Sequence, residues 1–190
     1  MHETEDTAHI NNIIKGDYSA YRFLVDKYKD KVYNLSLKMM KNETDAEELT
    51  QISFIKAYNS LHKFQRKAAF STWLYRINYN SCLTQLRLKR KNVQSLEENI
   101  ESSNLQTMEV TFNSMIEKDR RHYVSLALEK LKPDERILLN LCYKEDKNMN
   151  EIGVIMNLSH SNVRVKLMRT RNKLLQIMNK ILKHEIGELL

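Results

Sequence analysis

The sequence has very few of the residues that make tight turns. Its 190 residues include only 3 Gly and 1 Pro. Gly permits the backbone angles that sharp turns need, so a chain with so little of either residue favours helices joined by polar loops. Pro133 suits the first turn of a helix, where a missing N–H costs nothing. The sequence therefore predicts an all-α protein.

Signatures of metal, redox and catalytic sites are also missing. The two cysteines, Cys82 and Cys142, lie far apart among helix-forming residues, which favours buried thiols over a zinc site or a redox pair. No HxxxH or HExxH spacing, Gly-rich phosphate loop or GxSxG motif occurs. We therefore expect no metal, no cofactor and no catalytic activity of the chain's own.

No apolar run of about 18 residues and no signal peptide is found. We therefore expect a cytoplasmic protein without stable membrane insertion. What the sequence has in excess is positive charge, with a formal net charge of +7 and a pI near 9.3. Because Lys and Arg release counterions when they neutralise phosphates, this charge favours nucleic acid as a partner. Anionic lipid would attract the same charge, but no membrane segment accompanies it.

Positive charge disappears from one internal stretch. After a basic block at residues 87–91, no Lys or Arg occurs until Lys118. Residues 92–117 contain five Glu, with Ser and Asn between them and too few apolar residues for a core. We predict a flexible acidic linker there, between two small helical domains at 1–91 and 118–190. Fully extended it could reach roughly 85 Å, enough to hold two DNA-binding domains well apart.

Apolar residues at helical spacing predict the elements of both domains. In the first domain we expect helices over 10–41, with a break at Gly16-Asp17, and over 45–64 and 70–91. In the second we expect helices over 119–131, 134–143, 150–156 and 161–183.

The last two of these helices are typical of a helix-turn-helix, with a polar corner at residues 157–159. The longer helix has one apolar stripe, which leaves its short polar and basic residues free to contact base edges and phosphates in a major groove. The alternative is a solvated basic face on a carboxy-terminal helix. The residues predicted to contact duplex DNA are Ser159, His160, Ser161, Asn162, Arg164, Val165, Lys166 and Arg169.

The helix expected over 45–64 has apolar residues on two sides. Ala46, Thr50, Phe54, Ala57 and Leu61 occupy one side, and Leu49, Ile52 and Ile55 the other, beside Asp45, Glu48 and Gln51. Because a small domain usually buries only one side, the second side predicts a surface for docking another protein. A central helix buried all round is the alternative.

A basic loop and the next helix combine aromatic, amide and cationic groups. Lys63, Arg66 and Lys67 precede a helix face that carries Trp73, Arg76, Ile77, Asn80, Thr84 and Arg87. Unstacked bases rest on aromatic or guanidinium planes while cations follow the backbone, so this mixture suits single-stranded or melted DNA. A purely structural role for Trp73 in the core is the alternative.

Five segments, in order and spacing, resemble the extracytoplasmic-function (ECF) sigma factors, which are alternative initiation subunits of RNA polymerase. They are IIKGDYSAYRFLVDKY, DAEELTQISFIKAYNSL, FSTWLYRINYN, LEKLKPDER and EIGVIMNLSHSNVRVKLMRTRNKL. The resemblance covers nearly the whole chain except the first residues and the linker. It identifies residues 1–91 as similar to sigma region two and residues 118–190 as similar to sigma region four.

The resemblance implies three contact surfaces and no chemistry of the chain's own. The helix with Asp45, Glu48, Leu49, Gln51 and Ile52 would grip the clamp coiled coil of core RNA polymerase. A second surface would melt and read the promoter element just upstream of the start site, holding an extruded base in a pocket. The last helix would read the distal element as duplex. The second surface comprises Lys63, Phe64, Arg66, Lys67, Ser71, Trp73, Arg76, Asn80 and Arg87.

Regulation by an anti-sigma factor is typical of the family. Acidic linkers in the family resemble polyanionic occupants of the polymerase's nucleic-acid channel. For residues 92–117 the alternative is a solvated spacer. The chain departs from the family pattern at Ile52, where an acidic residue is usual, at Tyr58 (Trp), at Thr84 (Asp) and at Val165 (Ser). A second hypothesis is a stand-alone helix-turn-helix regulator that acts without polymerase.

Overall fold

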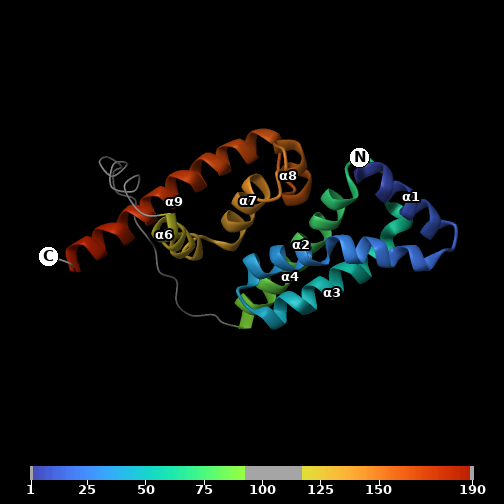
Figure 1. Ribbon diagram of the computed structural model, residues 1–190, viewed down its shortest axis with the longest axis horizontal. Helices are drawn as coiled ribbons and strands as arrows, with labels where there is room; N and C mark the ends of the chain where they lie inside the picture. Colours follow the sequence, from blue (N-terminus) through green and yellow to red (C-terminus); the bar gives the residue numbers. More distant parts are fainter. Residues whose placement is uncertain (1, 93–116, 189–190) are drawn as a thin grey trace.

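A computed structural model describes the backbone of residues 2–92 and 117–188 and the side chains of 5–90 and 121–182. These ranges contain helices and no strand, which confirms the all-α prediction (Figure 1). None of the helices described is long and apolar enough to cross a bilayer. The α-helices are α1 (His2–Ile14), α2 (Tyr21–Met40), α3 (Glu43–Ser60), α4 (Phe70–Asn92), α6 (Glu117–Glu129), α7 (Pro133–Tyr143), α8 (Met149–Met156) and α9 (His160–Glu188).

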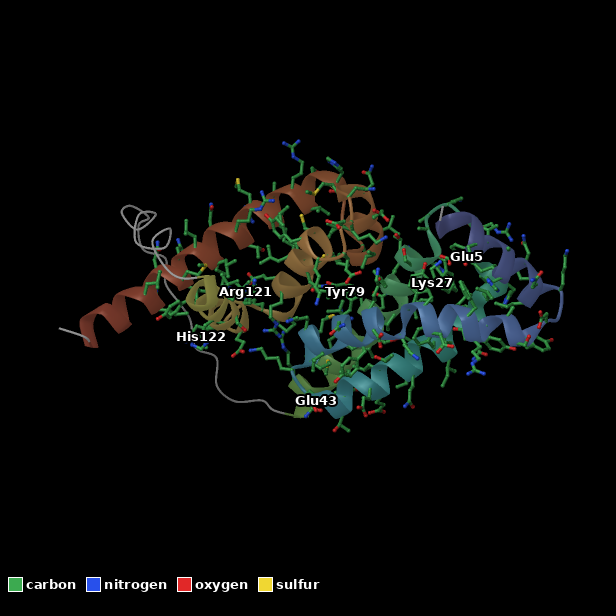
Figure 2. All side chains as sticks on the ribbon, viewed as in Figure 1. Glu5, Lys27, Glu43, Tyr79, Arg121 and His122 are labelled. Atoms are coloured by element: carbon green, nitrogen blue, oxygen red, sulfur yellow. The ribbon has the colours of Figure 1, made fainter. Side chains whose placement is uncertain are left out.

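Helix α1 starts well before Ile10, where the sequence pattern placed its beginning. Its residue Asp6 is buried and accepts a hydrogen bond of 2.5 Å from the Tyr28 hydroxyl of α2. Lys27 forms ion pairs with Asp6 at 2.5 Å and with Glu5 at 3.3 Å. Figure 2 labels Lys27 and Glu5, which lie near each other. These polar anchors fix the first turns of α1, and periodicity of apolar residues alone does not reveal them.

The N-terminal unit, α1 to α4, has a core in which α2, α3 and α4 pack against one another. Asn78 of α4 makes two buried hydrogen bonds in this core. Its amide donates to Ser36 Oγ on α2 at 2.7 Å and to Ser53 Oγ on α3 at 3.1 Å. Buried polar groups are tolerated when they are hydrogen-bonded, and a satisfied set fixes how helices align. Asn78 therefore sets the register of all three helices.

The C-terminal unit, α6 to α9, is built on the long helix α9 (Figure 1). The predicted stripe of α9 faces inward, with Val163, Leu167, Thr170 and Met178 all buried. Two ion pairs tie α9 to the start of α7, Lys166 to Asp134 at 2.5 Å and Lys173 to Glu135 at 2.8 Å. Pro133 is the first residue of α7, as expected.

The two units contact each other through α2 with α7 and through α4 with α8. Arg136 of α7 is 8% exposed and donates to two of the last carbonyls of α2, Lys38 at 2.7 Å and Met39 at 3.3 Å. Such carbonyls lack partners inside their own helix, so a cation there satisfies them. Residues 93–116 lie outside the described residues, so the acidic linker and the domain limits stay predictions.

Candidate nucleic-acid interface

Helices α8 and α9 meet at the predicted polar corner and form a helix-turn-helix. Asn148 caps α8, because its side chain accepts hydrogen bonds from the N–H groups of Asn150 and Glu151, each at 3.0 Å. The Glu151 carboxylate accepts from the Asn148 N–H at 3.1 Å and so completes a capping box. The start of α8 is thus fixed by three residues of local sequence.

The corner between α8 and α9 depends on Asn157, which adopts a left-handed backbone conformation, and on Gly153, which lets the next segment approach closely. Asn157 ends α8 in the left-handed conformation, with φ 56° and ψ 48°, which Asn adopts more readily than most residues. Gly153 lies so close to the next segment that a Cβ there would sit 2.7 Å from the Leu158 carbonyl oxygen. A residue with a side chain at 153 would push α9 away from α8.

The outer face of α9 carries most of the residues predicted to contact duplex DNA. Ser161, Asn162, Arg164, Val165 and Arg169 are exposed, as are Ser159 and His160 at the corner. Ser159 also has a structural role, since its hydroxyl accepts from the Asn162 N–H at 3.2 Å and caps α9. Lys166 is partly buried in its ion pair with Asp134, so Arg164 and Arg169 carry the free charge of this face.

The second predicted DNA surface begins with an aromatic cluster. The Trp73 ring lies 5.1 Å from that of Phe64 and 5.8 Å from that of Phe70, measured between centroids. Trp73 is half-buried, whereas Phe70 is buried. Trp73 therefore packs against two aromatic neighbours and is also partly accessible, so the alternatives of core residue and base platform both stay predictions.

Cations and amides continue this surface along α4 and the loop before it. Lys63, Lys67, Arg76, Asn80 and Arg87 are all exposed. Arg66 is exposed too, adopts a positive φ of 57° and donates to the side chain of Asn11 in α1. The loop is therefore held against α1.

Helix α3 presents a narrower outward face than the sequence predicted. Ala46, Thr50, Phe54, Ala57 and Leu61 are buried, as expected. The prediction that Leu49 faces outward is wrong: it is only 5% exposed, because at 100° per residue it adjoins the inward stripe that contains Ala46 and Ser53. Glu48 and Gln51 are exposed, Ile52 is half-buried and Ile55 is 60% exposed. Asp45 is held by an ion pair of 2.5 Å with Lys89 of α4.

Sequence reasoning missed a polar contact between the two units at the start of α4. Thr72 donates to Glu151 at 2.8 Å, and Tyr75 donates to Glu145 at 3.0 Å. Lys147, which also pairs with Glu151 at 2.8 Å, donates to Ser71 at 3.0 Å. The partners lie 70 to 79 residues apart in sequence, so no local pattern signals them.

These contacts shift the pKa values of Glu151 and Tyr75. Burial by itself raises the pKa of Glu151, but hydrogen bonds from Lys147, Thr72 and the Asn148 N–H outweigh it and lower the pKa below its ordinary value. Burial, and then the nearby Glu145 carboxylate, raises the pKa of the Tyr75 hydroxyl. Glu151 is therefore ionised and Tyr75 protonated at neutral pH, which are the forms that make the observed hydrogen bonds.

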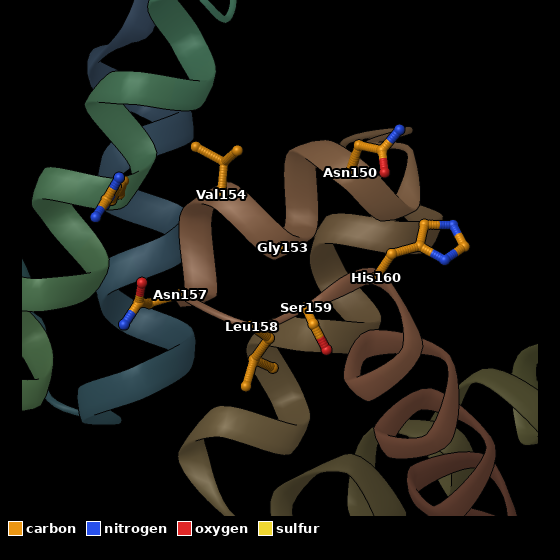
Figure 3. A pocket seen from close by; sticks show the side chains of 8 residues that line it. Asn150, Gly153, Val154, Asn157, Leu158, Ser159 and His160 are labelled. Carbon is orange, nitrogen blue, oxygen red and sulfur yellow. The ribbon is translucent and has the colours of Figure 1, made fainter.

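The two predicted DNA surfaces adjoin each other in this arrangement. Arg76 of α4 lines a cleft whose other residues come from α8 and the corner before α9. Asn150, Val154, Asn157, Ser159 and His160 surround that cleft (Figure 3). The arrangement brings Arg76 of α4 close to the beginning of α9.

Comparison with known proteins assigns the two units separately. A family model described as Sigma-70 region 2 matches residues 24–92, and one described as Sigma-70, region 4 matches residues 121–174. The chain is 33% identical over 175 residues to the ECF RNA polymerase sigma factor SigW of Bacillus subtilis, which covers 87% of this chain and 92% of that one.

Solved structures resemble the fold at lower identity. CnrH, solved in complex with the cytosolic domain of CnrY, gives a TM-score of 0.64 at 18% identity and covers 93% of this chain and 98% of that one. The sigma factor RpoE of Bartonella quintana, solved with the anti-sigma factor NepR, gives a TM-score of 0.61 at 19% identity and covers 84% and 96%.

Replacing Gly153 by Ala should destabilise the C-terminal unit by about 1–3 kcal/mol, because the new methyl group overlaps the Leu158 carbonyl oxygen. Chemical denaturation followed by circular dichroism measures this loss. Val154→Ala, at the neighbouring and exposed position, serves as the control and should be nearly neutral. Equal stability of the two variants would mean that the corner accommodates a side chain at 153.

Proposed function

The chain belongs to the ECF family of RNA polymerase sigma factors, and we propose that it performs this function through three separate surfaces. One surface binds core polymerase, a second binds the opened strand of the promoter, and a third binds promoter duplex. The helix-turn-helix with an exposed basic outer face is the observation that carries the proposal. The chain directs initiation, and the polymerase carries out the chemistry.

The polymerase-binding surface is the outward face of α3. Glu48, Gln51 and Ile52 lie on this face, and the exposed Ile55 extends it. An apolar patch with polar edges is the usual composition of a protein interface. Asp45 and Leu49 support it from within, Asp45 through Lys89 and Leu49 through the core, so we assign these two residues positioning roles in place of direct contact.

The opened-strand surface joins the 63–69 loop to α4. The accessible part of Trp73, together with Phe64, offers an aromatic plane for an unstacked base. Lys63, Arg66, Lys67, Arg76 and Arg87 supply charge for the phosphates, and Ser71 and Asn80 supply polar side chains. This combination suits an opened strand, because unstacked bases rest on aromatic rings while cations follow the phosphates.

The duplex-binding surface is the start and outer face of α9. Arg164 and Arg169 can form bidentate hydrogen bonds with guanine, while Asn162 and Ser161 lie at the helix start, where they and the helix N-terminus can contact phosphates or bases. Val165, exposed to 43%, offers an apolar contact of the kind made with thymine methyl groups. His160 and Ser159 border this surface, and Lys166 lies beside it in its ion pair with Asp134.

A regulatory anti-sigma factor and residence in the cytoplasm complete the proposal. The RpoE structure, which shares the fold, was solved with such a partner. We expect such a partner at a groove whose lining includes the apolar Leu37, Leu128 and Leu174 beside charged side chains of both signs.

The decisive experiment is run-off transcription with purified core RNA polymerase and a library of promoter fragments. We expect selective initiation only when the chain is added. A stand-alone regulator, the second hypothesis, would instead footprint its site without polymerase and fail to retain core enzyme in a pull-down. Family membership favours the sigma-factor function over that alternative.

Changing Arg164 or Arg169 to Ala should weaken promoter binding by about 1–3 kcal/mol for each lost bidentate base contact. Binding to core polymerase should stay as in the wild type, because the polymerase-binding surface is assigned to α3 and not to α9. Gel-shift titration of the holoenzyme and a pull-down of core enzyme measure the two affinities. Equal loss of both would contradict separate surfaces.

Trp73→Ala should impair strand opening more than duplex binding, because it removes the platform for an extruded base. Stacking of a base on an aromatic side chain is worth about 1–3 kcal/mol. Permanganate reactivity of promoter thymines reports opening, and Trp73→Phe is the control that keeps an aromatic ring. Unchanged permanganate reactivity in Trp73→Ala would exclude Trp73 from this role.

Glu48→Lys should weaken binding of core polymerase about tenfold or more, equivalent to at least about 1.4 kcal/mol. Glu48 lies on the exposed face of α3, so reversing its charge changes that face without touching the core. Asp30→Lys, an equal charge reversal at an exposed position of α2, is the control. If both variants bind core enzyme equally well, the docking face lies elsewhere.

A further inference from the structure

A groove of about 900 Å³ lies where the end of α2 meets α6, α7 and α9. Sites for small molecules usually enclose about 300–1,000 Å³ and combine apolar walls with a few polar groups. The walls of this groove include Leu37 of α2, Leu128 of α6 and Leu174 of α9, each of them only partly buried. None of the residues that we assign to DNA or polymerase binding lines it. The groove therefore has the size and the apolar surface for a ligand of its own.

Positive charge is in excess around this groove. Five of its lining residues are Lys or Arg and two are Glu. Lys38 and Lys144 are exposed, and neither forms an ion pair within the part of the chain that the structure describes. The Arg171 guanidinium lies over the Tyr143 ring, 5.3 Å from its centroid. A cation over an aromatic ring keeps its full charge, so these three side chains favour an anionic ligand.

The remaining two cations of the groove also lack enough negative charge around them. Burial, and then the charge of Arg136, lowers the pKa of Lys41, and the opposite effect of Glu129 does not compensate. Burial likewise lowers the pKa of Arg136. A negative charge that enters the groove stabilises the charged form of both side chains. A neutral or cationic ligand would bring no such gain.

A buried amide on the same wall has no hydrogen-bond partner. Asn140 of α7 lines the groove, and its side-chain nitrogen is shielded from solvent and finds no acceptor among the described residues. An unpaired buried donor is costly and uncommon in folded proteins. A ligand oxygen in the groove supplies the missing acceptor once the amide turns toward it. The polar part of the ligand is therefore an acceptor as well as an anion.

We propose that this groove binds a small anionic amphiphile, a single alkyl chain with a carboxylate head, as in a fatty acid. The alkyl chain packs on the leucine walls, and the basic side chains and the Asn140 amide bind the carboxylate. The ligand is a free molecule, because a flat bilayer surface reaches a concave groove poorly. The groove is also where we expect an anti-sigma factor, so the two occupants exclude each other there. The inference goes beyond the proposed sigma-factor function and does not depend on it.

Isothermal titration calorimetry on the full-length chain tests the ligand chemistry with three probes of equal chain length. Decanoate is anionic, decanol is neutral and decylamine is cationic, and each is used below the concentration at which it forms micelles. We expect decanoate to bind about tenfold or more tightly than decanol, because its head accepts charge-assisted hydrogen bonds. Decylamine should bind most weakly. Equal affinity for all three would mean unspecific adsorption to apolar surface and overturns the proposal.

Two paired variants test whether the groove cations bind the carboxylate. Lys144→Gln with Arg171→Gln should weaken decanoate binding about tenfold or more and leave decanol binding unchanged. Lys180→Gln with Arg90→Gln is the matched control, since it removes the same charge from exposed positions that do not line the groove. The control should bind decanoate as the wild type does. An equal effect of the two pairs, whether loss or no change, overturns the proposal.

A third variant fills the groove without changing charge. Ser125 lies on α6, is exposed and lines the groove, so a large side chain there occupies the ligand space without disturbing the core. Ser125→Trp should abolish binding of decanoate and of decanol, whereas Ser125→Ala should keep both. Circular dichroism verifies that each variant is as helical as the wild type. Wild-type affinity of Ser125→Trp for decanoate would place the ligand elsewhere and overturns the proposal.

A vesicle assay distinguishes a free amphiphile from a membrane surface. If the chain sediments with vesicles of phosphatidylglycerol and phosphatidylcholine but gives no calorimetric binding of decanoate, the proposal is overturned in favour of a bilayer. All of these measurements use the chain without polymerase or DNA, so their outcome is separate from that of run-off transcription. Selective initiation without decanoate binding would leave the sigma-factor function standing and refute the ligand site, and the reverse result would do the opposite.

Discussion

Two basic side chains, Arg136 and Lys41, hold the two halves of this protein together by donating to the carbonyl groups at the C-terminal ends of α2 and α6. Arg136 of α7 donates to Lys38 and Met39 at the end of α2 and, at 2.7 Å, to the carbonyl of Leu131. In return Lys41, just past the end of α2, donates at 2.5 Å to the carbonyl of Glu129 at the end of α6. Helix C-termini carry partial negative charge and unpaired carbonyls, so cations at both ends stabilise both helices.

The position of α8 on α4 follows from this junction. With α7 fixed against α2, the loop after α7 and the start of α8 come to lie on the first turns of α4, where Glu145 and Glu151 find hydroxyl donors. These polar contacts border an apolar cluster that residues of both units share, among them Leu74 of α4 and Ile152 of α8.

Much of the site follows from local sequence because its determinants are local. Asn148 and Glu151 stand three residues apart and define the start of α8, and Asn157 allows the left-handed turn that ends it. Helical spacing correctly placed Val163, Leu167 and Thr170 inside the C-terminal unit. The same spacing misplaced Leu49, because a position at the edge of an apolar stripe turns inward or outward according to the width of the neighbouring helix contact. Helical spacing thus predicted most of the exposed and buried positions of these helices, but it did not predict the positions at the edges of the apolar stripes.

The sequence by itself determined the helical class, the helix-turn-helix and the family, since turn-poor composition, periodic apolar residues and ordered motifs are properties of short segments. Only the tertiary structure decided which charged residues are free and which are engaged. Lys166 is held by Asp134 and Asp45 by Lys89, whereas Arg164 and Glu48 remain exposed. It also decided that Arg136 caps a helix 98 residues away. Such pairings depend on how helices pack, and a hydrogen bond between distant residues leaves no periodic trace in either segment.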